Sequence, residues 1–504
     1  MRLRLLESYE PKEKVALWVS LFLHICCAWF SIGYHYDDEH WQILEFANYK
    51  LGLSPASDLP WEFVDQIRPT LQPFIVYVFA KFMMVLHLYN PFTLIFLLRL
   101  VSAVLSWLAT LLVIKSTRMF FVERDHFYYL ILFSSFLWFI PYIHVRYSGE
   151  TWSGLFFFFG FYYLLKIFER NNSSDWMLKS LFSGICMGLA FWCRFQITFA
   201  FIGLGLWIVV FKLKSIRKLI PAIIGGVLIL GLGILLDRWF YEKWVFTPFN
   251  YFESNIINNV AARYGETPWW DYFYLFLLHG GMPLSIVLFA MLLISIVAKP
   301  KSPYIWTMLA FLLGHMVVGH KELRFLFPMI YIFPICCFLF FDSTPTLKRL
   351  SIIPKRVKSI LLTTLIVINT VLLIVMVFLK PPSEHVFVYR YIYDYTKGAP
   401  TKVITLHKDP YRPAWLKANY YKPRNLEVVT IDSIKRINSY LNKEDTLLFF
   451  DDHFDLSPSI IKNSDVRFEL LYRNVPEFIK YLNFNGWVDR TKVYCVYKPV
   501  KVIN

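Results

Sequence analysis

The chain has 504 residues, of which 57% are hydrophobic, 19% are aromatic and only 17% are charged. With a mean hydropathy of +0.46, this composition excludes an ordinary soluble protein, whose surface needs a larger share of charged side chains. The formal net charge of +16 does not indicate nucleic-acid binding, because the lysines and arginines are spread over many short loops and form no strip studded with aromatic residues.

Apolar runs dominate the first three quarters of the chain. A membrane-spanning helix needs about 20 mostly apolar residues, and roughly a dozen such runs lie between Val15 and Leu379. The first run is longer than the core of a signal peptide and lacks a small-residue cleavage site, so we expect a retained helix. The sequence predicts an all-α polytopic membrane protein, with about 11–13 transmembrane helices in residues 1–380.

The distribution of lysine and arginine predicts the topology, because cytoplasmic loops collect these residues. Connections rich in them are expected in the cytoplasm: 2–14, 115–124, 166–179, 212–218, 299–301 and 348–358. The alternate connections are then extracytoplasmic: 34–69, 144–152, the bend near Arg194, 238–271, 319–324 and everything after Leu379. Two apolar runs, 70–88 and 92–114, lie where an odd number of crossings is required, and the sequence leaves open which of them does not cross.

Acidic residues gather in the first external loop, in the stretch YDDEHWQILEFANYK. On a helix, one stripe would carry Asp38, Gln42, Glu45 and Tyr49, with Trp41, Leu44 and Leu51 on the opposite side. We expect such a helix to lie in the membrane interface and to present its carboxylates to the space above. The alternative is the solvated face of an ordinary amphipathic helix.

Three arginines share the predicted external face. Arg68 stands before Pro69, which favours an extended start of the next helix. Arg146 and Glu150 are four residues apart, which on a helix would allow an ion pair. Arg194 interrupts an apolar run, and charge inside a membrane is costly enough to indicate a functional partner. Structural pairing or anchoring at the interface would explain the same arginines.

The stretch HKELRFLFP, at 320–328, holds the densest group of charges between two apolar runs. Its cations His320, Lys321 and Arg324 flank Glu322, and cations in a partly dry site suit a phosphate. Together, the carboxylates and the cations suit group transfer from a lipid phosphate. A carboxylate would take the proton of an incoming hydroxyl, and the cations would stabilise the departing phosphate. Anchoring at the interface is the alternative for this group.

These stretches resemble motifs of glycosyltransferase family 22, the Alg9-like and GPI-anchor-type mannosyltransferases. HKELRFLFP matches the family's HKE-x-RF-x-x-P signature, and DDEHWQ is similar to its DE-x-x-Q pattern in the first loop. The segment from Asp237 to Asn255 and the segment from Tyr264 to Phe273 are similar to two further motifs, in the same order.

The resemblance implies a GT-C fold and an inverting transfer of a mannosyl or other hexosyl residue. The donor would be a polyprenyl-phosphate sugar, usually dolichyl-phosphate mannose, and the acceptor a glycan or glycolipid at the extracytoplasmic or lumenal face. The membrane would be a bacterial plasma membrane or the endoplasmic reticulum. A lipid-linked sugar flippase or transporter is the alternative, although no internal repeat typical of transporters is visible.

Carried over to this sequence, the family pattern implies Asp38 as the catalytic base, with Glu39 beside it to orient the acceptor. Asp37 competes with Asp38, because Tyr36 and Asp37 stand where the family has His-Pro or a close variant. The donor phosphate would be bound by His320, Lys321 and Arg324, with Arg68, Arg146 and Arg194 as further candidates. The remaining polar residues of these motifs are Gln42, Glu150 and Glu322. We expect no metal and no cofactor, since no ligand spacing indicates one.

The last part of the chain, 381–504, has the composition of a soluble extracytoplasmic domain. Short strands are predicted at 402–407, 426–431, 445–452 and 493–500, with helices at 433–443 and 475–483. Strands that alternate with helices predict a small α/β domain. Asp451 and Asp452 follow a strand and are interpreted as solvated acids. The seven cysteines predict neither a disulfide framework nor a zinc site.

Overall fold

The computed structural model describes residues 6–121, 123–169, 174–342, 354–383, 385–406, 408–413, 415–441, 446–462, 466–486, 488 and 492–501. Contacts divide the chain into two compact units. The helical unit comprises Met1–Ser31, Glu62–Phe74 and Phe96–Leu379, and the mixed unit comprises Ile32–Trp61, Ile75–Ile95 and Lys380–Asn504. This grouping follows contacts rather than chain order, so the division into domains at residue 380 stays a prediction.

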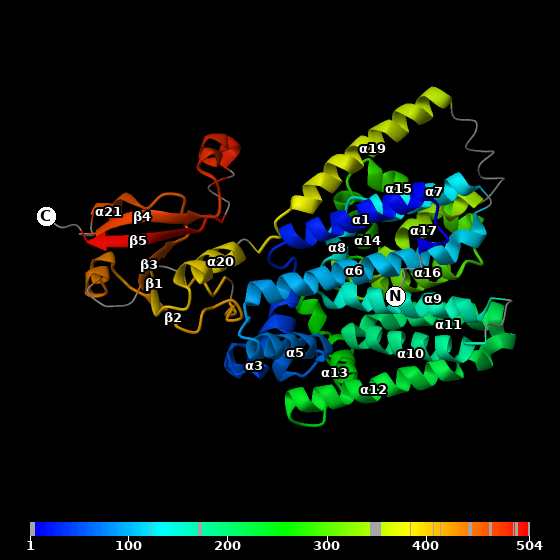
Figure 1. Ribbon diagram of the computed structural model, residues 1–504, viewed down its shortest axis with the longest axis horizontal. Coiled ribbons are helices and arrows are strands. Elements are labelled where there is room, and N and C mark those ends of the chain that lie inside the picture. Colours follow the sequence, from blue (N-terminus) through cyan, green and yellow to red (C-terminus); the bar gives the residue numbers. More distant parts are fainter. Residues whose placement is uncertain are drawn as a thin grey trace. The chain divides into compact units, whose positions relative to one another are not determined.

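The helical unit is built from helices of very different length (Figure 1). Its helices are α1 (Pro11–Phe30), α7 (Arg124–Phe136), α8 (Ile140–His144), α9 (Gly149–Ile167), α10 (Trp176–Cys193), α11 (Thr198–Lys212), α12 (Ile220–Tyr241), α13 (Thr247–Phe252), α14 (Asp271–His279), α15 (Leu284–Ala298), α16 (Pro303–Val317), α17 (Phe333–Phe338) and α19 (Lys355–Phe378). Three more helices run through the boundaries between the units: α4 (Trp61–Val64), α5 (Leu71–Val85) and α6 (Pro91–Thr117).

Several helices are long and apolar enough to cross a membrane. Within the described part of the chain these spans are Pro11–Phe30, Pro91–Thr117, Trp176–Cys193, Phe195–Tyr241 and Lys355–Phe378. The pair Leu323–Tyr331 and Phe333–Phe341, bent by 72°, would make a sixth. The predicted polytopic helical architecture is therefore confirmed, while the number of 11–13 crossings stays a prediction.

Helices α5 and α6 differ in what they can span. The 15 residues of α5 rise about 22 Å, less than the hydrocarbon core of about 30 Å. The 27 residues of α6 are long enough to cross. Of the two apolar runs between 69 and 115, the first is therefore the one that is too short for a full span.

Helix α9 is held against the segment Leu323–Tyr331, a 3₁₀ helix that contains most of HKELRFLFP. A Cβ atom at Gly154 would lie 2.5 Å from the carbonyl oxygen of Pro328, so only glycine allows this approach. At the start of α9, the Ser148 side chain caps the helix by accepting the backbone N–H of Thr151 at 3.2 Å. These contacts fix the first turn of α9, which carries Glu150.

The mixed unit contains a five-stranded sheet in the order β2-β1-β3-β5-β4. Its strands are β1 (Thr401–Thr405), β2 (Leu426–Thr430), β3 (Thr446–Asp451), β4 (Val466–Arg473) and β5 (Cys495–Lys501). Strand β1 is parallel to β2 and β3, whereas β5 is antiparallel to β3 and β4. The four predicted strands and the α/β class are confirmed. Strand β4 was not predicted, although Val466, Phe468 and Leu470 alternate with charged residues.

Helices accompany the sheet in the mixed unit. They are α2 (Asp37–Glu39), α3 (Glu45–Lys50), α20 (His385–Thr396) and α21 (Pro458–Lys462). The helices predicted at 433–443 and 475–483 are present as short 3₁₀ turns, at Ile434–Ser439 and Glu477–Leu482.

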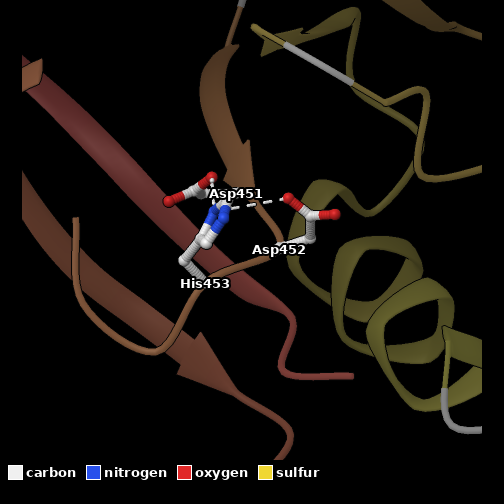
Figure 2. Close-up of side chains that lie close together, drawn as sticks. All are labelled: Asp451, Asp452 and His453. Carbon is white, nitrogen blue, oxygen red and sulfur yellow. Dashed lines mark hydrogen bonds and ion pairs between the residues drawn. The ribbon is translucent and has the colours of Figure 1, made fainter. Parts of the chain in front are cut away.

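The end of β3 brings together Asp451, Asp452 and His453 (Figure 2). The imidazole of His453 lies between both carboxylates, with Nδ1 3.1 Å from Asp451 Oδ1 and 3.4 Å from Asp452 Oδ1. The ammonium group of Lys408 lies 3.2 Å from Asp452 Oδ2. Three potential ligand atoms are close enough for a metal ion, but Lys408 already neutralises one acid, so we assign no ion to this cluster.

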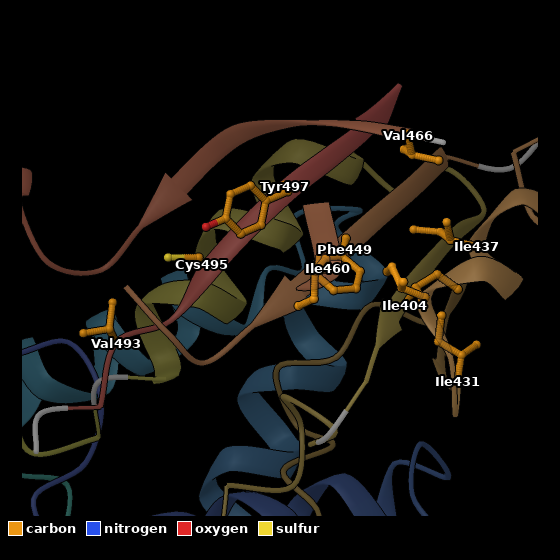
Figure 3. Close-up of a cluster of buried hydrophobic side chains, with 10 residues drawn as sticks. Ile404, Ile431, Ile437, Phe449, Ile460, Val466, Val493, Cys495 and Tyr497 are labelled. Atoms are coloured by element: carbon orange, nitrogen blue, oxygen red, sulfur yellow. The ribbon is translucent and has the colours of Figure 1, made fainter. Parts of the chain in front are cut away.

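The core of the sheet is a cluster of aliphatic and aromatic side chains (Figure 3). Ile404 of β1, Phe449 of β3 and Tyr497 of β5 form its centre, and Ile437 and Ile460 cover them from the connecting segments. Burial of such side chains contributes about 1.5–3 kcal/mol each. The mixed unit therefore has a hydrophobic core of its own. The seven cysteines are free.

Candidate active site

In the mixed unit, the predicted catalytic acids begin a helical run over residues 37–50, here called the acidic helix. It consists of α2, the π-helical segment His40–Leu44 and α3. Asp37 is exposed, whereas Asp38 and Glu39 are half-buried. The side-chain amide of Gln42 donates to Asp38 Oδ1 at 2.8 Å, and Glu39 Oε2 accepts the backbone N–H of His35 at 3.4 Å. Gln42 therefore fixes the orientation of Asp38, one turn away.

Glu45, one of the carboxylates expected to face the space above the acidic helix, is covered by another part of the chain. Glu45 is buried, and its Oε1 lies 3.1 Å from His40 Nε2 and accepts the backbone N–H of Tyr420 at 2.7 Å. His40 is stacked between the rings of Tyr34 and Tyr421. Burial extends over both stripes of the helix, because the segment 383–421 covers it within the mixed unit.

Residues from the segment 383–421 bind the first external loop at Tyr34 and at Trp41. Near the start, the backbone N–H of Tyr34 donates to Ser383 Oγ at 2.7 Å, and the Tyr34 hydroxyl lies 2.6 Å from His385 Nε2. Burial lowers the pKa of His385 to about 3, helped by the charges of His40 and Lys492. Trp41 Nε1 donates to the carbonyl oxygen of Lys417 at 3.1 Å. The C-terminal part of the chain thereby positions the acidic helix.

In the helical unit, the stretch HKELRFLFP folds its cations around its own carboxylate. Arg324 grips Glu322 with two bonds, from Nε to Oε2 at 2.7 Å and from Nη2 to Oε1 at 3.0 Å. His320 Nε2 lies 3.0 Å from Glu322 Oε1, and its Nδ1 lies 3.0 Å from the carbonyl oxygen of Gly265. Both ring nitrogens of His320 thus face acceptors, and only the protonated imidazole can donate to both.

Glu150 connects this stretch to Arg194. Its Oε1 lies 2.7 Å from Arg194 Nη1 and 3.9 Å from Arg324 Nη1, and all three side chains are buried. Both guanidinium groups lie close to the ring of Phe325, that of Arg194 at 4.9 Å and that of Arg324 at 5.4 Å from its centroid. We call Glu150, Arg194, His320, Glu322 and Arg324 the Arg–Glu network. Two arginines face two carboxylates in it, so the charges of these four side chains balance.

Lys321 is held by the backbone, and its predicted role in phosphate binding stays a prediction. Its ammonium group donates to three backbone carbonyl oxygens, those of Thr267 at 3.0 Å, Val318 at 2.8 Å and Gly319 at 3.3 Å. Burial lowers the pKa of Lys321. All three ammonium donors are therefore occupied, which favours a structural role over direct phosphate binding.

The loop 319–321 contacts the segment Tyr264–Phe273, which lies more than fifty residues earlier in the chain. Besides the bonds from His320 to Gly265 and from Lys321 to Thr267, the backbone N–H of Thr267 donates to Gly319 O at 3.1 Å. Two sequence motifs thus form one local structure. The sequence indicated both motifs but carried no signal that they touch.

Arg68 and Arg146 are held by other residues of the helical unit. Arg146 is buried and donates through Nη2 to the carbonyl oxygen and hydroxyl of Ser31. Arg146 does not share a helix with Glu150, because the backbone between α8 and α9 is not helical. The predicted ion pair of these two residues required one helix, and that premise is wrong. Arg68 Nη2 lies 3.5 Å from Glu62 Oε1.

Asp237 is a buried acid. The sequence placed it in a family motif but did not indicate what it does. Its Oδ1 accepts the hydroxyl of Thr70 at 2.7 Å and the backbone N–H of Thr70 at 3.2 Å, and its Oδ2 accepts the hydroxyl of Thr247 at 2.6 Å. This carboxylate ties the segment after Arg68 and the start of α13 to the end of α12.

Comparison with known proteins supports one family. The sequence profile described as the Alg9-like mannosyltransferase family matches residues 15–423. Mannosyltransferase APTG1 of Arabidopsis thaliana is 27% identical over 308 residues, which are 59% of this chain and 53% of that protein. GPI mannosyltransferase 3 of Drosophila melanogaster is 28% identical over 353 residues, 66% of this chain and 56% of that protein. The chain spans about half the length of the curated relatives it matches.

A solved structure shares the fold. The crystal structure of ArnT from Cupriavidus metallidurans bound to undecaprenyl phosphate has a TM-score of 0.51, with 11% identity, over 96% of this chain and 97% of that one. At this identity the likeness shows the fold alone, which is the expected GT-C fold.

Proposed function

This chain belongs to the Alg9-like mannosyltransferase family, and from that premise we propose that it transfers a mannosyl residue from a polyprenyl-phosphate donor to a glycan or glycolipid acceptor. The match of the family profile over residues 15–423 carries the proposal, because it covers the acidic helix and the Arg–Glu network together. The names of the relatives, which include GPI mannosyltransferase 3, favour mannose as the sugar and a GPI-type glycolipid as the acceptor.

In the proposed reaction, Asp38 takes the proton of an acceptor hydroxyl. The hydroxyl oxygen then attacks the anomeric carbon of the donor sugar, and the bond from that carbon to the phosphate oxygen breaks, with its electron pair leaving on the phosphate. The bond from Gln42 to Oδ1 holds the Asp38 carboxylate in one orientation, as a general base requires. A single base is enough for a transfer with inversion, so Glu39 serves to orient the acceptor.

The Arg–Glu network would stabilise the leaving phosphate. Arg324 and Arg194 are prepared as forked donors, and Glu322 and Glu150 keep them in place while no anion is bound. A phosphate would compete with Glu322 for Arg324 and take over its charge-assisted bonds. ArnT, which shares the fold, was crystallised with undecaprenyl phosphate bound, and this supports a polyprenyl phosphate as the donor carrier.

The alternative, a lipid-linked sugar flippase or transporter, is separated from transfer by the role of Asp38. The full chain is reconstituted into vesicles with mannose-labelled polyprenyl phosphate and extracted glycolipid acceptor, and Asp38→Asn is compared with the exposed neighbour variant Asp37→Asn. We expect Asp38→Asn to lower turnover about 10²- to 10⁴-fold with donor binding kept. Asp37→Asn should change turnover little.

Label that crosses the membrane without joining an acceptor, at the same rate in both variants, would indicate transport instead. Loss of turnover in Asp37→Asn alone would assign the base to Asp37.

A further inference from the structure

The mixed unit contains a cavity of about 980 Å³, a volume typical of small-molecule sites. Three segments contribute lining residues: 48–58 at the end of the acidic helix, 89–91, and 393–428, which starts within α20. The reaction proposed above does not use this cavity.

The cavity wall combines tyrosines with side-chain amides. Tyr89, Tyr393, Tyr411 and Tyr420 contribute rings, and Asn48, Asn419 and Asn425 contribute amides. Flat aromatic faces pack on the apolar side of a sugar ring, and amides bond its hydroxyls. The wall is rigid at Tyr411, whose ring is stacked on that of Tyr389 at 4.5 Å.

The buried hydroxyl of Tyr411 indicates that the cavity binds a polar ligand. The residue is 1% exposed, and its hydroxyl has no hydrogen-bond partner among the described residues. A buried hydroxyl without a partner destabilises the fold, and a ligand hydroxyl or phosphate oxygen that bonds to it would remove this cost.

The charge of the cavity is positive. Lys397, Lys417, Lys422 and Arg424 line it with Asp58 and Asp409, so four cations face two carboxylates. Lys417 and Asn419 satisfy Asp58, at 3.2 Å and 2.9 Å. Lys397, Lys422 and Arg424 form no ion pair with a described residue, which leaves them available for an anion.

The cavity is connected to the proposed catalytic acid through the acidic helix. Asn48 lines the cavity, and Asp38 lies ten residues earlier on the same helical run, which corresponds to about 15 Å along the axis. Glu45, between them, accepts the backbone N–H of Tyr420, another cavity residue. The cavity and the acid are therefore held at a fixed separation, comparable to a few sugar rings.

We propose that this cavity binds the acceptor through a phosphate-bearing part of its glycan and so directs the free end of the glycan to Asp38. The inference rests on the proposed function, because it assumes that Asp38 faces the acceptor hydroxyl. Lys422 and Arg424 bind the phosphate, Tyr393 packs on a sugar ring, and Tyr411 donates to a ligand oxygen.

Binding is measured first by titration calorimetry on the full chain in detergent micelles, with mannose 6-phosphate as the probe and mannose and inorganic phosphate as comparators. We expect mannose 6-phosphate to bind more tightly than either comparator. The double variant Lys422→Gln, Arg424→Gln should weaken binding of mannose 6-phosphate about tenfold or more. The control variant Lys435→Gln changes an exposed lysine of the same unit that lies outside the cavity. It should leave the binding of mannose 6-phosphate unchanged.

Turnover separates this proposal from the proposed function. In the vesicle assay, the double variant should raise the acceptor KM about tenfold while kcat and the donor KM stay unchanged. An unchanged acceptor KM overturns the cavity proposal and leaves the transfer reaction standing. Sugar-phosphate binding by a chain that transfers no mannose would overturn the proposed function instead.

Anionic lipid is the competing source of phosphate. Micelles doped with phosphatidylglycerol should not displace mannose 6-phosphate. If they displace it, or if inorganic phosphate binds as tightly as the sugar phosphate, the cavity is a site for lipid headgroups or free anions, and its role for the acceptor is overturned.

Discussion

Arg194 Nη1 lies 2.7 Å from Glu150 Oε1, and both side chains are buried. This ion pair joins the end of α10 to the first turn of α9, and Arg324 approaches the same carboxylate oxygen at 3.9 Å. Two cations around one buried carboxylate are held in place by it, and in the proposed reaction they would be preorganised for the donor phosphate.

Breaking this pair from one side should strongly destabilise the protein. Glu150→Gln leaves the buried Arg194 without its carboxylate, so we expect the free energy of unfolding to fall by about 3–5 kcal/mol. The double variant Glu150→Gln, Arg194→Gln should recover part of the loss. The measurement is thermal unfolding of the purified chain in detergent.

The matched control is Glu169→Gln. Glu169 pairs with Lys166 at 2.6 Å, but both side chains are partly exposed, so the loss should stay below about 1 kcal/mol. Equal losses in the two variants would mean that Glu150 is not held as a buried partner.

Arg324→Lys should impair donor binding more than folding. A lysine keeps the charge but loses the fork that makes two bonds, so we expect the donor KM to rise at least about tenfold. Steady-state kinetics with varied donor concentration measure it. If the donor KM is unchanged and only the acceptor KM rises, Arg324 does not bind the donor phosphate.

Lys321→Gln should impair folding more than donor binding. Loss of the ammonium group leaves backbone carbonyls of the 264–273 and 318–319 segments unpaired, at a cost of about 1–3 kcal/mol in stability. The donor KM of the folded fraction should not change. A raised donor KM at unchanged melting temperature would restore the predicted phosphate-binding role of Lys321.

The mixed unit should loosen in acid because of His385. Its folded pKa of about 3 lies below the unfolded value of 6.5, so the unfolded state binds the proton more readily. The stability contributed by neutral His385 is complete above pH 6.5 and is lost as the pH falls towards 3, at about 1.4 kcal/mol per pH unit. Hydrogen exchange of the acidic helix between pH 7 and 4.5 measures the effect, and His385→Gln should reduce the pH dependence. The same pH dependence in both chains would contradict it.

The sequence predicted the elements of the site better than their contacts. Periodicity and charge indicated the apolar helices, four of the five strands, the acidic loop and the HKELRFLFP stretch, because these depend on neighbouring residues. The burial of Glu45 depends on Tyr420, and the occupation of Lys321 depends on Thr267. No local pattern reports partners so distant in the chain. Strand β4 was missed although Val466, Phe468 and Leu470 alternate with charged residues, a local pattern that indicates a strand.

The most direct test of mannosyl transfer compares glycolipids by mass spectrometry, in cells that lack the protein and in the same cells supplied with the native chain or with Asp38→Asn. We predict that the deficient cells accumulate an acceptor short of one hexose, that the native chain restores the hexose, and that Asp38→Asn does not. Identical glycolipids in all three would contradict the account.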